Sequence, residues 1–147
     1  MQNPDFDREL TRLLNFSVPL LGVDSLFRHL QDYTLLDVRT REEYEISHIP
    51  GSEFLGYPEA DSEVMTKLPK DQPLVLYCSV GYRSERMAER LRKQGFTKVY
   101  NLYGSIFEWA NRGYPLENAQ GVRTDSLHTY NRQWSRWVEN PRVVRVW

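Results

Sequence analysis

The sequence predicts an α/β fold in which a parallel β-sheet is flanked by helices on both faces. Short apolar runs rich in strand-forming residues alternate with amphipathic segments along the chain. This alternation is typical of parallel sheets whose strands are buried on both faces. In addition, the chain's only cysteine, Cys78, directly follows one of the apolar runs. It would lie at the carboxyl edge of the sheet, where open α/β proteins bind their ligands.

The expected strands are short and bounded by polar or turn residues. Three of them cover residues 35–38, 74–77 and 99–102. A fourth, at residues 18–21, contains Pro19, which suits an edge strand or a strand start because proline has no N–H to donate.

Helical periodicity predicts the segments between the strands. The expected helices cover residues 24–31, 42–47, 62–68, 84–95 and 105–111. The helix from Ser84 is the clearest, because serine is a good N-cap residue and Gly95 suits a left-handed C-terminal cap. Short helices between short strands complete the α/β pattern.

The 147 residues fit one compact domain. We expect a lead-in at residues 1–17, a core domain at residues 18–116 and a tail at residues 117–147. The tail contains Trp134, Trp137 and Trp147, and such aromatic residues need a surface to pack on. That surface is either the domain's own edge, which we favour, or a partner, which includes a second copy of the chain in a homodimer.

Composition and charge exclude several classes of function. Lysine and arginine number 19 and aspartate and glutamate 20, so a net charge of −1 provides no global attraction to nucleic acid or to an acidic membrane. The sequence has no signal-peptide pattern and no run of about 18 apolar residues. One cysteine cannot form an internal disulfide, which is compatible with a reducing compartment. We therefore expect a cytoplasmic protein without membrane contact.

The segment after Cys78 indicates a reactive thiol. Its sequence is Ser79-Val80-Gly81-Tyr82-Arg83, and the expected helix begins directly after it. Loop N–H groups and the positive end of a helix form an anion-binding nest, and a nearby cation also stabilises a thiolate. Gly81 permits a sharp turn, and Arg83 offers a fork of donors to an oxyanion. A cysteine buried only for packing does not require such a polar loop.

Three groups of residues, in order along the chain, carry a resemblance to a known family. They are residues 35–39 with 43–44 and 48–51, residues 74–84, and residues 104–115. On these segments the chain resembles the single-domain rhodanese family of sulfurtransferases, over about residues 18–116. Ser47 and Tyr103 stand where the family commonly has glycine, and neither belongs to the thiol loop.

The resemblance implies a three-layer rhodanese-like fold and a two-step sulfur transfer without a metal or an organic cofactor. Cys78 would attack the outer sulfur of a small anionic donor such as thiosulfate and form a persulfide. Cyanide, a cellular thiol or a thioredoxin-like protein would then remove the sulfur. The substrate pocket would be lined by Ser79, Val80, Gly81, Tyr82 and Arg83, whose N–H groups stabilise developing charge.

Three further residues are expected to support the loop. Asp37 and Arg39 follow an expected strand on the same sheet edge as Cys78, and we expect them, with Ser84, to brace the loop. The alternative for Asp37 and Arg39 is a surface ion pair worth about 0–1 kcal/mol. We expect His48, which precedes Ile-Pro-Gly, to belong to a structural turn rather than to act as a general base.

Two other functions compete with sulfur transfer. A cysteine-loop phosphatase also uses a thiolate, a backbone nest and an arginine. It resembles a cysteine followed by five residues and then arginine, whereas only four residues separate Cys78 from Arg83. A rhodanese-fold interaction module is the non-enzymatic alternative. The presence of both Cys78 and Arg83 disfavours it.

Overall fold

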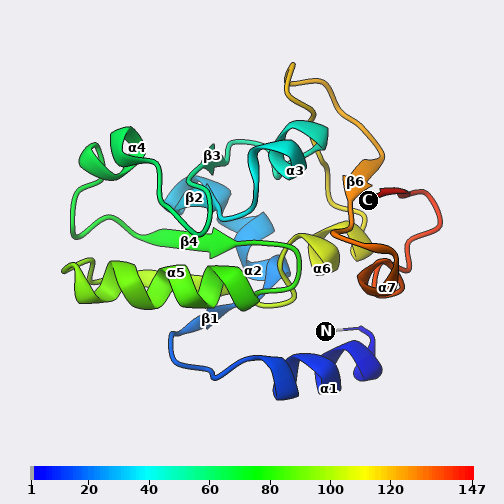
Figure 1. The fold of residues 1–147 in the computed structure, drawn as a ribbon, viewed down its shortest axis with the longest axis horizontal. Helices are drawn as coiled ribbons and strands as arrows, with labels where there is room; N and C mark the ends of the chain where they lie inside the picture. Colours follow the sequence, from blue (N-terminus) through cyan, green and yellow to red (C-terminus); the bar gives the residue numbers. More distant parts are fainter. Residues whose placement is uncertain (1) are drawn as a thin grey trace.

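The computed structural model describes residues 2–147 and contains a five-stranded parallel sheet at its centre (Figure 1). The strands lie in the order β1-β5-β4-β2-β3, and every neighbouring pair is parallel. Their bounds are Leu20–Leu21 (β1), Thr34–Asp37 (β2), Glu53–Phe54 (β3), Leu74–Tyr77 (β4) and Val99–Leu102 (β5). The strand that precedes Cys78, β4, is therefore the central one.

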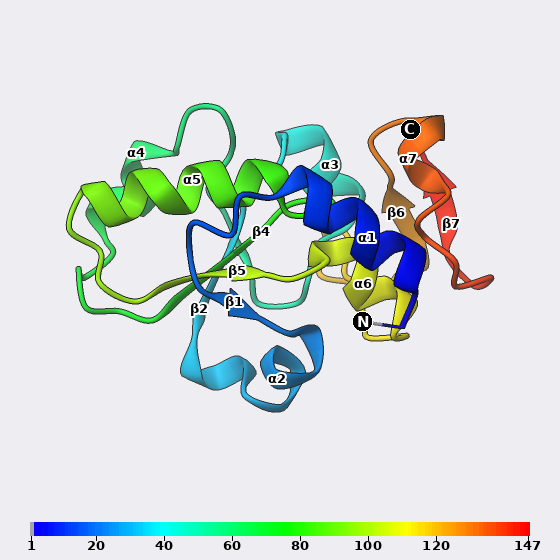
Figure 2. The ribbon, with the colours of Figure 1, turned by 90° about the horizontal axis from the view of Figure 1, so that it is seen from below.

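Helices cover both faces of this sheet. They are α1 (Pro4–Leu13), α2 (Val23–Arg28), α3 (Arg41–Ile46), α4 (Ser62–Thr66), α5 (Tyr82–Lys93), α6 (Ser105–Asn111) and α7 (Arg132–Ser135), with a 3-10 turn at Leu30–Asp32. Figure 2 shows α4 and α5 on one side of the sheet and α2 on the other. Within residues 2–147, no helix has the length and the apolar character needed to cross a bilayer.

Two apolar cores, one on each face, result from the alternation of side chains along the strands. Leu74 and Leu76 of β4 pack with Met87 and Leu91 of α5. The neighbouring Val75 belongs to the opposite core, with residues of α2 and α6. Since successive strand side chains point to opposite faces, a run of consecutive apolar residues is what a doubly covered strand requires. The predicted α/β fold with helices on both faces is confirmed.

The boundaries differ from the prediction at the helix after the thiol. Ser84 was expected to be its N-cap, but α5 begins at Tyr82 and its N-cap is Gly81, with a φ of 120°. The expectation was wrong because the turn after Cys78 uses a left-handed backbone, which glycine adopts without a steric penalty. Ser84 is buried in the first turn of α5 instead. Strand β3 was not predicted, because two residues carry no readable alternation.

The two ends of the chain pack on the domain itself. Phe6 of α1 is fully buried and stacks on Trp137, with ring centroids 5.4 Å apart. The tail adds a second, two-stranded parallel sheet, made of β6 (Ser126–His128) and β7 (Val144–Val146). Leu127 and Val138 belong to the same core as α6, whereas Trp147 is 58% exposed. The lead-in and the tail thus lie side by side near α6 (Figure 2).

Candidate active site

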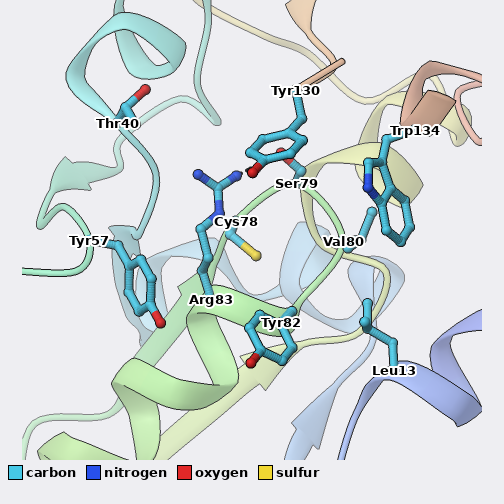
Figure 3. Close-up of a pocket in the computed structure, with 10 residues that line it drawn as sticks. All are labelled: Leu13, Thr40, Tyr57, Cys78, Ser79, Val80, Tyr82, Arg83, Tyr130 and Trp134. Carbon is cyan, nitrogen blue, oxygen red and sulfur yellow. Dashed lines mark hydrogen bonds between the residues drawn. The ribbon is translucent and has the colours of Figure 1, made fainter. Parts of the chain in front are cut away.

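The thiol of Cys78 lies immediately beyond the carboxyl end of β4 (Figure 3). The residue is only 1% exposed. The Gly81 N–H donates a hydrogen bond to Sγ over 3.1 Å, and the hydroxyl of Ser84 lies 3.5 Å from the same atom. The sulfur is therefore buried in a polar setting, at the point where the loop turns into α5.

Helix α6 orients the peptide groups of the loop. The carbonyls of Cys78 and Ser79 accept hydrogen bonds from the N–H groups of Ile106 and Phe107, over 3.2 and 3.1 Å. In a trans peptide the carbonyl and the following N–H point in opposite directions, so the N–H groups of Ser79 and Val80 face away from α6. Within residues 2–147, neither has an acceptor. The loop thus presents unpaired donors, as an anion nest requires.

The first turn of α5 supplies further donors. The N–H groups of Tyr82 and Arg83 likewise have no acceptor in the described part of the chain, as expected at a helix N-terminus. Their partial positive charge favours an anion beside Sγ. The predicted residues 79–83 are therefore gathered around the thiol.

A buried asparagine holds the turn in place. Asn101 of β5 is 0% exposed, and its amide donates to the Gly81 carbonyl over 3.1 Å. Its carbonyl oxygen accepts from the Ser84 hydroxyl over 2.6 Å. Ser84 therefore links the loop to β5 as well as contacting the thiol. Asn101 was not singled out from the sequence, although a polar residue inside an apolar strand was a visible signal.

The guanidinium of Arg83 is paired with a carboxylate from another helix. Its two terminal nitrogens donate to Glu43 of α3 over 2.8 and 2.9 Å, and one also donates to Ser79 Oγ over 3.0 Å. The pair is largely buried, with 15% of the Arg83 side chain and 3% of the Glu43 side chain exposed. Arg83 was expected to offer its donor fork to a substrate anion. The structure instead directs that fork at Glu43.

Glu43 is a site residue that the sequence analysis named only as part of the family motif. Thr40 and Glu43 form a capping box, in which the Thr40 hydroxyl accepts from the Glu43 N–H and the Glu43 carboxylate accepts from the Thr40 N–H. This pattern, a threonine followed three residues later by glutamate, is readable from sequence. The capping box holds the Glu43 carboxylate at the start of α3, where Arg83 pairs with it.

Glu43 and Arg83 stabilise each other's charged forms. Burial alone would raise the pKa of Glu43, but hydrogen bonds and charge from Arg83, with a smaller contribution from Arg39, lower it to about 2. Burial would lower the pKa of Arg83, but the hydrogen bonds to Glu43 and the electrostatic interactions with Cys78 and Glu43 raise it. The two side chains are therefore a charged pair at neutral pH.

This pair predicts an acid-sensitive contribution to stability. The pKa of Glu43 falls from 4.5 to about 2 on folding, so the unfolded chain takes up the proton first as the pH drops. The stabilisation, at most about 3 kcal/mol, is complete above about pH 5.5, and roughly 2 kcal/mol of it is lost by pH 3. Urea unfolding of wild type and Glu43→Gln should therefore differ less at pH 3 than at pH 7. A pH-independent difference would contradict this assignment.

Asp37 and Arg39 form a second pair, beneath the loop. Both side chains are 0% exposed, and Arg39 donates to the Asp37 carboxylate and to the Ser47 carbonyl over 2.6 and 2.7 Å. The pair is therefore not a surface ion pair. The Arg39 guanidinium lies 5.7 Å from the centre of the Tyr77 ring, the residue before Cys78. It supports the strand end rather than residues 79–83 directly.

His48 forms an isolated β-bridge just before the turn at residues 50–51. Its ring stacks on Tyr44 with centroids 4.0 Å apart, and Nδ1 lies 2.9 Å from the Tyr44 carbonyl oxygen. Its backbone pairs with Glu117. His48 does not line the cavity above Cys78. These contacts agree with a structural role, although His48 precedes the turn rather than belonging to it.

A cavity of about 420 Å³ opens above Cys78 (Figure 3). It is lined by Leu13, Thr40, Tyr57, Cys78, Ser79, Val80, Tyr82, Arg83, Tyr130 and Trp134. Tyr82, the first residue of α5, is 44% exposed at its mouth. The sequence analysis did not expect the lead-in and the tail to reach the site.

The central part of the chain matches a known family. The sequence profile of the Rhodanese-like domain family matches residues 23–112, which is more than half of the chain. The chain belongs to this family. The match includes the thiol loop and both buried ion pairs, whereas α1 and the tail lie outside it.

Named relatives include sulfurtransferases. The "Probable adenylyltransferase/sulfurtransferase MoeZ" of Mycobacterium tuberculosis is 38% identical over 82 residues, which are 55% of this chain and 21% of that protein. The chain thus spans about a fifth of the length of MoeZ. The "Thiosulfate sulfurtransferase GlpE" of Pseudomonas fluorescens is 36% identical over 91 residues, which are 62% of this chain and 82% of GlpE.

Solved structures share the fold. The rhodanese-like domain of Anabaena Alr3790 superposes with a TM-score of 0.65 at 26% identity, over 72% of this chain and 83% of that one. The BH2092 protein of Bacillus halodurans reaches a TM-score of 0.67 over 93% of this chain and all of its own, at 19% identity. The second likeness concerns the fold alone.

Proposed function

We propose that the protein is a sulfurtransferase that carries a sulfane sulfur as a persulfide on Cys78. The observation that carries this proposal is the position of Cys78 Sγ at the base of the cavity. Sγ accepts a hydrogen bond from the Gly81 N–H, and it lies beside the N-terminus of α5, whose first N–H groups have no acceptor within residues 2–147. Such a setting stabilises a thiolate and, after transfer, a persulfide anion. The relatives named as sulfurtransferases support the same reaction class.

The transfer takes place in two displacement steps. The Cys78 thiolate attacks the outer sulfur of thiosulfate, the sulfur–sulfur bond of the donor breaks, and sulfite leaves with the electron pair. Cyanide or a thiol, either free or on a thioredoxin-like protein, then attacks the outer sulfur of the persulfide. The bond to Sγ breaks and the Cys78 thiolate is restored. Covalent catalysis of this kind divides one transfer into two easier steps.

The loop residues have distinct roles in this scheme. The N–H groups of Ser79, Val80, Gly81, Tyr82 and Arg83 stabilise the charge on sulfur. The Arg83 side chain, held by Glu43, fixes Ser79 and the start of α5 rather than neutralising a donor. A phosphatase would need that guanidinium for the phosphate oxygens. Its pairing with Glu43 argues against the phosphatase alternative.

Intact-protein mass spectrometry tests the proposal. Wild-type protein is treated with thiosulfate, freed of excess donor and weighed, beside a sample whose thiol was first alkylated. We expect a gain of one sulfur atom in the unblocked sample only, and its release as thiocyanate on addition of cyanide. If neither thiosulfate nor an organic persulfide loads sulfur, the proposed function is wrong.

A further inference from the structure

Away from the loop N–H groups beside Sγ, the described residues that line the cavity offer no free side-chain cation to an anionic occupant. Of the residues that line it, only Arg83 has a permanently charged side chain, and both of its terminal nitrogens are bonded to Glu43. The ring of Tyr130 covers the same guanidinium, 5.2 Å from its carbon centre to the ring centroid. The cation is therefore matched by a carboxylate and shielded by an aromatic face. Backbone N–H groups remain the anion donors, and they lie at the base, beside Sγ.

The size of the cavity exceeds what a small inorganic anion needs. Its volume of about 420 Å³ lies within the range of roughly 300–1,000 Å³ that is typical of sites for organic ligands. Cys78 is 1% exposed, so a sulfur acceptor must enter this cavity to reach the persulfide. The acceptor therefore has room for a body beyond its reacting atom.

Apolar and aromatic side chains form the upper walls. Figure 3 shows the rings of Tyr57, Tyr82, Tyr130 and Trp134 around the opening, with Leu13 below the indole. Such walls stabilise a bound apolar or aromatic group, because its apolar surface is buried and its ring can stack on theirs.

Part of this wall comes from outside the family match at residues 23–112. Leu13 belongs to α1, and Tyr130 and Trp134 belong to the tail. Tyr130 has a φ of 73°, a left-handed conformation that non-glycine residues rarely adopt. The Asn131 side chain accepts from the Trp134 N–H over 2.8 Å and fixes the start of α7. The tail is thus held in a specific conformation over the thiol.

We propose that this cavity selects an organic thiol with an aromatic or otherwise apolar body as the sulfur acceptor. This inference rests on the proposed function. The acceptor's body packs between Trp134, Leu13 and the tyrosine rings, and its thiolate points at the outer sulfur on Cys78. That thiolate forms a bond to the outer sulfur, the bond to Sγ breaks, and the Cys78 thiolate leaves. The product is the organic persulfide, and no oxidant or reductant is consumed.

The test compares two thiols that differ in their apolar body. Protein loaded with sulfur is mixed with 2-phenylethanethiol or with 2-mercaptoethanol, and the second-order rate constants for sulfur removal are corrected to equal thiolate concentration. We expect the phenyl compound to react at least about tenfold faster, since about 1.4 kcal/mol of added binding gives that factor. Each rate is divided by the rate of sulfur removal by cyanide from the same protein, so that a general loss of reactivity in a variant cancels.

Variants locate the preference. Trp134→Ala is expected to reduce the preference, which is the rate for 2-phenylethanethiol divided by the rate for 2-mercaptoethanol, to below about threefold. Leu13→Asn changes the wall formed by α1 and should reduce this preference independently. Trp147→Ala is the matched control, because Trp147 is 58% exposed and does not line the cavity. It should leave the ratio unchanged.

The outcomes separate this inference from the proposed function. Loading and cyanide release with equal rates for the two thiols would overturn the acceptor preference and leave sulfur transfer intact. A preference that persists in both Trp134→Ala and Leu13→Asn would also overturn it, because the walls would not be its source. Failure to load sulfur at all would overturn both proposals.

Discussion

Cys78→Ser is expected to abolish sulfur loading and to lower turnover by about a thousandfold or more, as the loss of a catalytic nucleophile does. A serine hydroxyl has nearly the shape of the thiol but is far less acidic and does not form a persulfide. The Gly81 N–H that now donates to Sγ can donate to the oxygen instead. The free energy of unfolding should therefore change by less than about 1 kcal/mol.

The measurement combines mass spectrometry with thiocyanate release, and urea unfolding verifies the fold. Because Cys78 is the only cysteine, no other thiol of the chain can replace it. Turnover retained in Cys78→Ser would show that the chain does not transfer sulfur through a thiol. A large loss of stability would make the activity result uninterpretable, and Cys78→Ala then provides a second variant without a new polar group.

The main strands of the sheet could be predicted because each is encoded by a short, continuous apolar run. Each of the apolar runs at residues 35–38, 74–77 and 99–102 overlaps a strand whose bounds differ from those of the run by at most one residue at either end. Strand β3 was missed because Glu53 and Phe54 follow a turn and pair only through their backbone with β2. A strand of two residues has no period to detect.

The candidate site likewise has a part that could be predicted from local sequence and a part that could not. Cys78 and Gly81 belong to one continuous loop, so their proximity follows from sequence alone. The pairing of Arg83 with Glu43 joins residues forty positions apart and depends on where α3 lies against the loop. Trp134 reaches the cavity only because the tail folds back over the domain. Such contacts follow from tertiary packing, which no local pattern in the sequence encodes.

The Asp37–Arg39 pair is expected to have the largest effect on stability. Arg39→Met should lower the free energy of unfolding by about 3–5 kcal/mol, because it leaves the Asp37 carboxylate buried without its partner. Asp37 is 0% exposed, so solvent cannot replace the guanidinium. The Ser47 carbonyl also loses its donor. Urea unfolding at pH 7 measures the loss.

A double variant distinguishes an unpaired buried charge from lost packing. Arg39 Nη1 is buried and has no hydrogen-bond partner among residues 2–147, so even the wild-type pair is incompletely satisfied. Replacing both partners by apolar residues, as in Asp37→Leu with Arg39→Met, removes both charges at once and should recover at least about 1–2 kcal/mol relative to Arg39→Met alone. If the double variant is no more stable than the single one, the loss arises from packing against Tyr77, and the ion pair is not what supports the strand that precedes Cys78.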